Sequence, residues 1–278
     1  MIASARCCAR LAPVGESGGV TLRKSTMDAY IQYLIICPLL FLGGFVDSIA
    51  GGGGLITLPA YLLAGLPPHL ALGTNKFSSA MGTTISTARL ALNGFIKLRP
   101  ALICIAGAFI GSSIGSRLSL LISDEVFNKL LIIVLPIAAF YVMRNKGLSE
   151  DPEQHVDKTD AKTPLRIAAI AFFIGGYDGF YGPGAGTFLL LALTGWAMLD
   201  VRNAAGLTKA ANLTSNIAAL ITFILSSNVD YTLGLAGAVC NIAGAYIGAG
   251  MVLTKANKIV KPLIIVVLAL LFIKIIIK

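Results

Sequence analysis

Hydrophobic residues in this chain come in long blocks separated by short polar connections. An α-helix needs roughly 20 apolar residues to cross a bilayer core of about 30 Å. Eight blocks approach this length, at residues 30–50, 70–92, 101–122, 126–143, 165–181, 203–225, 232–253 and 259–277. A transmembrane β-barrel would instead show alternating segments of about 10 residues. The pattern therefore predicts an all-α integral membrane protein.

The composition agrees with this class. Hydrophobic residues make up 56% of the 278 residues and charged residues only 13%, against about 25% charged in soluble domains. In a soluble protein the net charge of +9 would suggest nucleic acid. Here most Lys and Arg lie in the connections, where they orient helices and contact anionic lipid. We expect membrane lipid, and no nucleic acid, among the partners.

The sequence carries no recognisable motif for catalysis, metal or nucleotide binding. The five cysteines form no CxxC pair, and His69 and His155 lie outside any HExxH spacing. Neither a GxSxG elbow nor a GxxxxGK[ST] motif occurs. We therefore expect no enzyme and no cofactor, and energy for transport from ion or solute gradients.

A polar stretch at residues 144–164, rich in Glu, Asp and Lys, divides the chain into apolar halves at 27–143 and 165–278. It predicts a cytoplasmic linker exposed to solvent. Residues 1–26 lack an apolar core of about 7–15 residues, so they do not form a cleavable signal. We expect a disordered extension there, with Met27 as a candidate natural start.

The two halves carry the same motifs in the same order. Residues 43–54 correspond to 175–186, residues 73–76 to 206–209, and residues 105–111 to 242–248. These matches align Asp47 with Asp178 and Lys76 with Lys209. We therefore predict two homologous halves, each with about four full transmembrane helices and one short helix after a glycine-rich break.

The short apolar segments after the glycines, residues 55–66 and 186–199, leave two topologies open. If they cross the membrane, the halves are inverted repeats, and the basic connections lie on one side with both termini outside. If they are re-entrant, eight spans form parallel halves, and Lys97 and Arg99 lie opposite the basic cluster at 255–261. We favour inverted repeats because they gather the positive charge on one side.

Four charged residues lie in or beside apolar blocks at matching positions in the two halves: Asp47, Lys76, Asp178 and Lys209. An unpaired charge there costs about 2.5–3.5 kcal/mol. We hypothesise that all four face an internal cavity, where the lysines attract an anion and the aspartates balance charge or carry a proton. The alternative is a pair of buried Asp–Lys bridges that only hold helices together.

The glycine-rich breaks are a second candidate part of a site. Glycine lets the backbone turn sharply and expose N–H groups, and a helix that begins directly afterwards adds the positive end of its dipole. The alternative role is close helix crossing. The candidate substrate-binding residues are Asp47, Gly51, Gly52, Gly53, Gly54, Asn75, Lys76, Asp178, Tyr181, Gly182, Gly184, Gly186, Lys209 and Asn212.

These motifs also resemble those of a known family. Residues 44–59, GFVDSIAGGGGLITLP, are similar to the signature of the TauE/SafE family, also called the sulfite exporter or DUF81 family. Residues 74–76, 177–183, 213–217 and 261–264 resemble its YfcA-like branch. The resemblance covers residues 27–278. It implies a multi-pass permease of the bacterial inner membrane, in a family associated with sulfite, sulfonates and other sulfur-containing organic anions.

Taken together, these features predict a secondary transporter. It would move a small anion, with a coupling proton or ion, by alternating access at a site near the membrane midplane between two repeats. An anion channel, a permease for another small organic solute and a non-transporting assembly subunit are the alternatives. The partners we expect are the anionic solute, lipid and, in a homo-oligomer, further copies of the chain.

Overall fold

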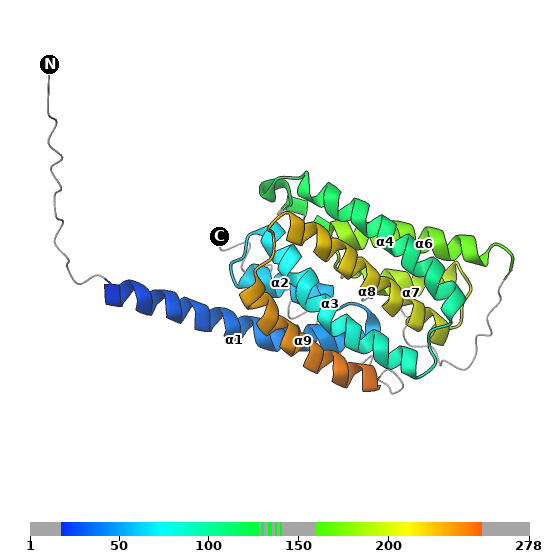
Figure 1. Ribbon diagram of the computed structural model, residues 1–278, viewed down its shortest axis with the longest axis horizontal. Helices are drawn as coiled ribbons and strands as arrows, with labels where there is room; N and C mark the ends of the chain where they lie inside the picture. The colour runs from blue at the N-terminus through cyan, green and yellow to red at the C-terminus, as the bar shows by residue number, and fades with distance from the viewer. Residues whose placement is uncertain are drawn as a thin grey trace, which may run out of the picture.

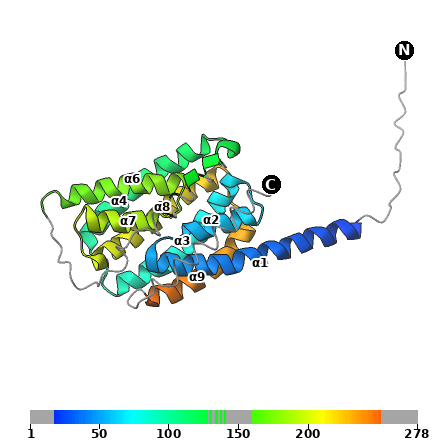
Figure 2. The same ribbon diagram turned by 180° about the vertical axis from the view of Figure 1, so that it is seen from behind.

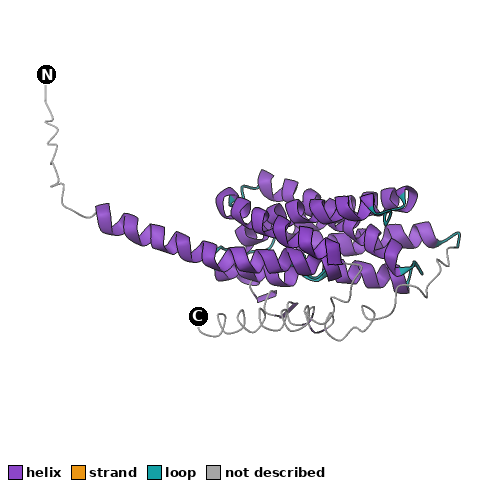
Figure 3. Cartoon of the chain, turned by 90° about the horizontal axis from the view of Figure 1, so that it is seen from below, coloured by secondary structure: helices purple, strands orange, loops and turns teal. Residues whose placement is uncertain are grey.

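The described part of the chain is helical and contains no strand (Figure 3). In the computed structural model, the structure describes residues 18–127 and 160–251, with further positions at 129–130, 133–134, 137 and 140. The helices are α1 (Gly18–Ala50), α2 (Gly54–Leu63), α3 (Pro68–Leu92), α4 (Leu98–Leu120), α6 (Thr163–Phe180), α7 (Ala185–Gly195), α8 (Val201–Leu225) and α9 (Tyr231–Met251). Over these ranges the predicted all-α class is confirmed.

Helix α1 is longer than the first apolar block. It begins at Gly18, so it includes residues 18–26, which the sequence analysis assigns to a disordered extension. No proline lies between Gly18 and Pro38, and once a helix has nucleated it extends readily by one hydrogen bond per added residue. Residues 1–17, most of the predicted linker and the last predicted block at 259–277 lie outside the described residues.

Several helices are suited to a membrane. By length and composition, three described segments could cross one: Gln32–Ile49, Leu98–Leu120 and Tyr231–Met251. Helices α2 and α7 are apolar but have only 10 and 11 residues, or about 15–17 Å at 1.5 Å per residue. That is roughly half of a bilayer core. Large apolar side chains such as Leu102 in α4 and Val239 in α9 are exposed on the outside of the bundle.

Helices α3 and α8 differ from the others because their buried faces are polar. Each has 25 residues. Helix α3 starts at a Pro pair, and α8 starts after Asp200, whose side chain accepts a hydrogen bond from the Asn203 backbone N–H at 2.9 Å. Their buried polar residues include Thr74, Asn75, Lys76, Ser78, Thr83, Ser86, Thr208, Lys209, Asn212, Ser215 and Asn216. Such faces require the two helices to lie inside the bundle.

The helices form two groups that lie side by side (Figures 1 and 2). Helices α1, α2, α3 and α9 form the first helix group, and α4, α6, α7 and α8 form the second. Contact between the groups runs through α3 against α8 and α1 against α7. Each half of the sequence therefore contributes one helix, α4 or α9, to the group built mainly by the other half.

Glycines allow the closest helix packing inside each group. A Cβ on Gly248 of α9 would lie 2.5 Å from the carbonyl oxygen of Phe45 in α1, and one on Gly107 of α4 would lie 2.8 Å from that of Ala168 in α6. Successive contacts advance in the same direction along both helices of each pair. Thus α1 runs parallel to α9, and α4 runs parallel to α6.

Helices α2 and α7 turn back along the helices that precede them. Gln32 near the beginning of the apolar part of α1 donates a hydrogen bond to the Ala64 carbonyl directly after α2, at 3.0 Å. In the second half, the ring of Tyr177 in α6 lies 5.6 Å from that of Phe188 in α7. Each glycine-rich break is therefore the tip of a helical hairpin.

Candidate functional site

The two glycine-rich breaks meet where the helix groups face each other. Gly51 has φ +73°, and a Cβ there would lie 2.6 Å from the carbonyl carbon of Gly186. A Cβ on Gly54 would lie 3.1 Å from the Cα of Pro183. The breaks thus pack backbone against backbone. Side chains at Gly51 and Gly186 would push them apart.

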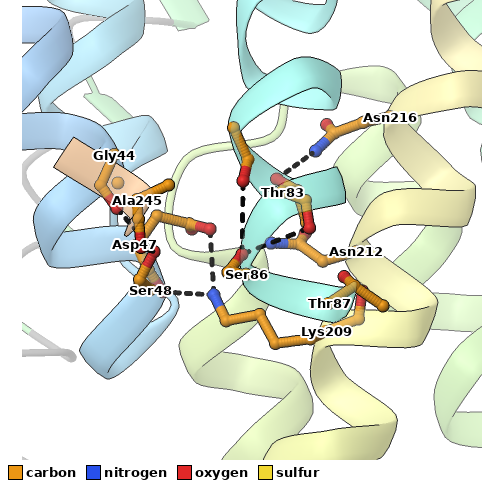
Figure 4. Close-up of polar contacts among 12 residues, drawn as sticks. Gly44, Asp47, Ser48, Thr83, Ser86, Thr87, Lys209, Asn212, Asn216 and Ala245 are labelled. Atoms are coloured by element: carbon orange, nitrogen blue, oxygen red, sulfur yellow. Dashed lines mark hydrogen bonds and ion pairs between the residues drawn. The ribbon is translucent and has the colours of Figure 1, made fainter. Parts of the chain in front are cut away.

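Each of the two aspartates pairs with the lysine of the other half. Lys76 Nζ lies 2.8 Å from Asp178 Oδ1 and donates a further hydrogen bond, at 3.1 Å, to the side-chain oxygen of Asn216. Lys209 extends from α8 to the end of α1, where it contacts the Asp47 carbonyl and lies 2.9 Å from Asp47 Oδ2 (Figure 4). Both pairs therefore join the two helix groups.

The two pairs differ in how deeply they are buried. The side chains of Lys76 and Asp178 are 1% and 4% exposed, and the hydroxyl of Ser215 contacts the Asp178 carboxylate. Those of Lys209 and Asp47 are 5% and 18% exposed. The Asp47 carboxylate is thus the more accessible of the two. The two pairs are the Asp–Lys bridges of the alternative interpretation, in which they only hold helices together.

A small polar cavity lies between the breaks and the pairs. Its volume is about 30 Å³, and a water molecule needs roughly 10–15 Å³ on this scale, so it holds about two waters. It is lined by Gly43, Asp47, Gly51, Gly53, Gly54, Thr57, Asn75, Lys76, Ser79, Thr83, Asp178, Gly182, Gly186, Asn212, Asn216 and Asn241.

Most of the predicted site residues line this cavity, and four do not. The Gly52 carbonyl accepts the Leu55 N–H at 3.1 Å, and Gly184 is the N-cap of α7 with φ +83°. Lys209 contacts Asp47, which lines the cavity. Tyr181 is not among the lining residues: its ring packs among aromatic residues, 5.9 Å from that of Tyr177.

The cavity also has polar lining residues that the predicted set omits. Ser79 and Thr83 follow Asn75 and Lys76 by one and two helical turns, and Asn216 follows Asn212 by one turn. A spacing of three or four residues places side chains on one helix face, so this signal was present in the sequence. Asn241 of α9 was not signalled, because it stands among small apolar residues.

The cavity is bordered by charged pairs, amides, hydroxyls and two helix starts. Both carboxylates face lysine ammonium groups, and amides and hydroxyls supply most of the remaining polar lining. Helices α2 and α7 begin beside the cavity with no side chain capping them, so the positive ends of their dipoles lie there. The N–H groups of Leu55, Ile56 and Thr57 already donate to the carbonyls of Gly52 and Gly53. Among the described residues, no group of three His, Cys, Asp or Glu side chains could hold a metal ion.

Comparison with known proteins identifies the family. The family described as "Sulfite exporter TauE/SafE" matches residues 36–275. A "Probable membrane transporter protein" of Haemophilus influenzae is 34% identical over 242 residues, which cover 86% of this chain and 93% of the relative. "Probable membrane transporter protein YfcA" of Escherichia coli K12 is 34% identical over 253 residues, covering 87% and 92%.

A more distant relative, "Probable membrane transporter protein YdhB" of Bacillus subtilis, is 27% identical over 219 residues, covering 78% and 88%. No solved structure matches significantly. The relatives are named as transporters, which implies a non-enzymatic function. With its apolar helices and these relatives, the chain is a multi-pass membrane protein that belongs to the TauE/SafE family of membrane transporters.

Proposed function

We propose that this protein is a secondary transporter that moves a small anion by alternating access through the cavity where the breaks meet. One observation carries the proposal. Two helix starts, one from each half, and two Asp–Lys pairs, each joining the two halves, border one polar cavity between the two helix groups. Secondary transporters commonly bind substrate where interrupted helices of two repeats meet.

The anion preference follows from the groups left to bind a solute. Backbone N–H groups at the breaks and the side-chain amides of Asn75, Asn212 and Asn241 can all donate hydrogen bonds. Helix N-termini favour negative charge. An oxyanion of sulfur presents several acceptor oxygens of this kind, and the family description names a sulfite exporter. A sulfur-containing oxyanion or organosulfonate is therefore the proposed substrate class.

Inverted repeats are supported by the directions of the helices. Helix α1 lies along α9, and α6 lies along α4. Helices α3 and α8 run antiparallel between the groups. Thr87, near the end of α3, donates to the Lys209 carbonyl at 3.1 Å, and Asn216, further along α8, donates to the earlier Thr83 at 3.5 Å. The first half would thus be related to the second by an axis in the membrane plane. Rocking of one helix group against the other at α3 and α8 would open the cavity alternately to each side.

The cavity volume fits a closed stage of this cycle. About 30 Å³ is too little for an organosulfonate with its carbon chain, so binding requires the breaks to move apart. Separation of the groups stretches both Asp–Lys pairs, and a bound anion would compensate the lysines. Asp47, the more exposed carboxylate, is the proposed carrier of a coupling proton.

Orientation follows from charge. Lys97, Arg99 and Arg202 lie at the starts of α4 and α8, at one end of the bundle, and excess Lys and Arg mark the cytoplasmic side. We place that end in the cytoplasm of a bacterial inner membrane, together with the linker.

Transport by purified protein in liposomes tests the proposal. We expect saturable uptake of labelled sulfite or sulfonate, exchange of labelled for unlabelled anion across the membrane, and a response to an imposed pH gradient. Flux that rises linearly with concentration and shows no exchange would favour a channel. A preference for cations, or no flux of any solute, would contradict the proposal.

A further inference from the structure

Two basic side chains at matching positions of the halves join the helix groups, one at each end of the bundle. The alignment of residues 73–76 with 206–209 also aligns His69 with Arg202, four residues earlier. Each is the second residue of its helix, α3 or α8. Because these two helices run antiparallel, their starts lie at opposite ends of the bundle, with the cavity between them.

The His69 ring contacts two acceptors in the last turn of α4 and the segment directly after it. Its Nδ1 contacts the Asp124 carboxylate, and its Nε2 lies 3.0 Å from the Ser119 carbonyl oxygen. The same carboxylate accepts the His69 backbone N–H at 3.4 Å. A carboxylate and a carbonyl oxygen only accept, so only the protonated ring, with an N–H on each nitrogen, can donate to both. The His69 side chain is largely buried, whereas that of Asp124 is half exposed.

Aromatic side chains fill the space between His69 and the second glycine-rich break. Phe127 is fully buried, and its ring centre lies 5.1 Å from that of His69 and 6.1 Å from that of Tyr181. Tyr181 directly precedes Gly182, which lines the cavity. His69 belongs to the first helix group, and the other aromatic residues belong to or follow helices of the second. Separation of the groups at this end would therefore break the contacts of His69 with Asp124 and Phe127.

At the opposite end, Arg202 binds the connection that follows α3. Its Nη2 donates to the Asn93 carbonyl at 3.1 Å, and its guanidinium carbon lies 4.5 Å from the centre of the Phe95 ring. A Cβ on Gly206, one turn later in α8, would overlap the Phe95 carbonyl oxygen, so the connection packs closely on α8. An arginine side chain stays protonated in proteins. This contact therefore does not depend on pH, unlike that of His69.

The other charged side chains described near the His69 end have partners of their own or face solvent. Glu125 and Lys129 form an ion pair at 2.9 Å, and both are largely exposed. Arg117, in the last turn of α4, is exposed. The Asp230 carboxylate accepts backbone N–H groups at the start of α9, and residues 64–68, which lead into α3, include no charged residue. Charge on the histidine ring is therefore balanced by the one carboxylate that it contacts.

We propose that His69 and Arg202 are positioning residues that hold the two ends of the transport pathway closed, a role that rests on the proposed alternating access. Protonated His69 holds its end closed through Asp124 and Ser119. Arg202 holds the other end closed through the connection after α3. Opening of either end requires only the contact at that end to break, so the cavity reaches one side of the membrane at a time.

The difference between the two residues makes one end sensitive to pH. An imidazole changes charge between about pH 5 and 8. Loss of its proton removes the charge and one of the two hydrogen bonds of His69, so this end opens more readily as the pH rises. In the orientation proposed above, it is the end that faces the outside of the cell. This device acts on which end opens, separately from the proton that Asp47 carries.

Hydrogen exchange of the full-length protein in lipid nanodiscs tests the assignment without a transported solute. At pH 6 we expect His69→Gln to speed amide exchange about three- to tenfold, both at residues 121–127 and at the two glycine-rich breaks. The breaks respond because water enters the cavity once this end opens. Arg202→Gln should speed exchange at residues 93–96 and, again, at the breaks.

A matched control and a pH profile separate control of the pathway from a local contact. Lys129→Gln removes an exposed ion pair at the His69 end and should exchange like the wild type. Wild-type exchange, divided by the intrinsic rate of an unprotected amide, should rise about three- to tenfold from pH 6 to pH 8 at residues 121–127 and at the breaks. His69→Arg, which keeps its charge, should remove that rise.

Two results would overturn the proposal. Faster exchange of His69→Gln at residues 121–127 alone, with the breaks unchanged, would show that His69 only fastens a connection. A pH-dependent rise that persists in His69→Arg would show that another group titrates. Opening of the predicted kind without anion flux in liposomes would instead contradict the proposed function, so the two failures are distinguishable.

Discussion

Variants of the Lys76–Asp178 pair can separate its contribution to the free energy of unfolding from its contribution to transport. Lys76→Met leaves the Asp178 carboxylate buried, at 4% side-chain exposure, without its cation. Removing one partner of a buried pair typically costs about 3–5 kcal/mol, whereas replacing both partners by neutral groups is often close to neutral. We expect Lys76→Met and Asp178→Asn each to lose about 3–5 kcal/mol, and the double variant to recover most of that loss.

The companion pair supplies an internal comparison. The Asp47 side chain is 18% exposed, so a charge left there is partly solvated. We expect Lys209→Met to cost less, about 1–3 kcal/mol. The order of the two costs follows from burial alone.

The free energy of unfolding in mixed detergent micelles measures both effects. If Lys76→Met is as stable as the wild type, or if the two single losses simply add in the double variant, Lys76 and Asp178 are not a coupled buried pair and the reasoning fails. Anion exchange by the stable double variant then separates the two roles. We expect transport to be lost, because the lysine is needed at the cavity, whereas full transport would show that the pair only holds the helix groups together.

Three further predictions concern the lining. Gly186→Ala would place a Cβ 2.8 Å from the Gly51 Cα and should reduce the uptake rate per folded protein by tenfold or more, about 1.4 kcal/mol in the activation free energy. The control Gly176→Ala, whose Cβ would meet nothing closer than 3.5 Å, should transport at a rate near that of the wild type. Equal rates for the two variants would contradict the close approach of the breaks. Asn241→Leu removes a donor and should raise the KM for the anion roughly ten- to hundredfold, with an unchanged KM counting against its role. Asp47→Asn should make uptake insensitive to an imposed pH gradient, and persistent pH-driven uptake would exclude Asp47 as the proton carrier.

Much of the fold could be predicted because bilayer length and helix length are linked. The apolar blocks predicted α3, α4, α6, α8 and α9 within a few residues, and the glycine-rich breaks predicted the short helices α2 and α7. The exchange of α4 and α9 between groups could not be predicted, since it depends on packing between distant segments. The sequence also left unresolved whether the short segments cross, because hydropathy does not report direction.

The candidate site shows a similar division. Matching positions in the two halves marked Asp47, Lys76, Asp178 and Lys209 as a set, but they did not predict which lysine pairs with which aspartate. In the structure each aspartate pairs with the lysine of the other half. Asn241 escaped prediction because a single amide in an apolar helix has no periodic signal. Long-range packing alone brings it to the cavity.

Locating a bound anion would test the central claim most directly. Selenite has the shape and charge of sulfite, and selenium gives an anomalous diffraction signal in a crystal of the protein. We predict one strong peak between Gly53 and Gly186, within hydrogen-bonding distance of backbone N–H groups at the starts of α2 and α7. A crystal with selenite ordered elsewhere in the protein, and none between the two breaks, would contradict the account.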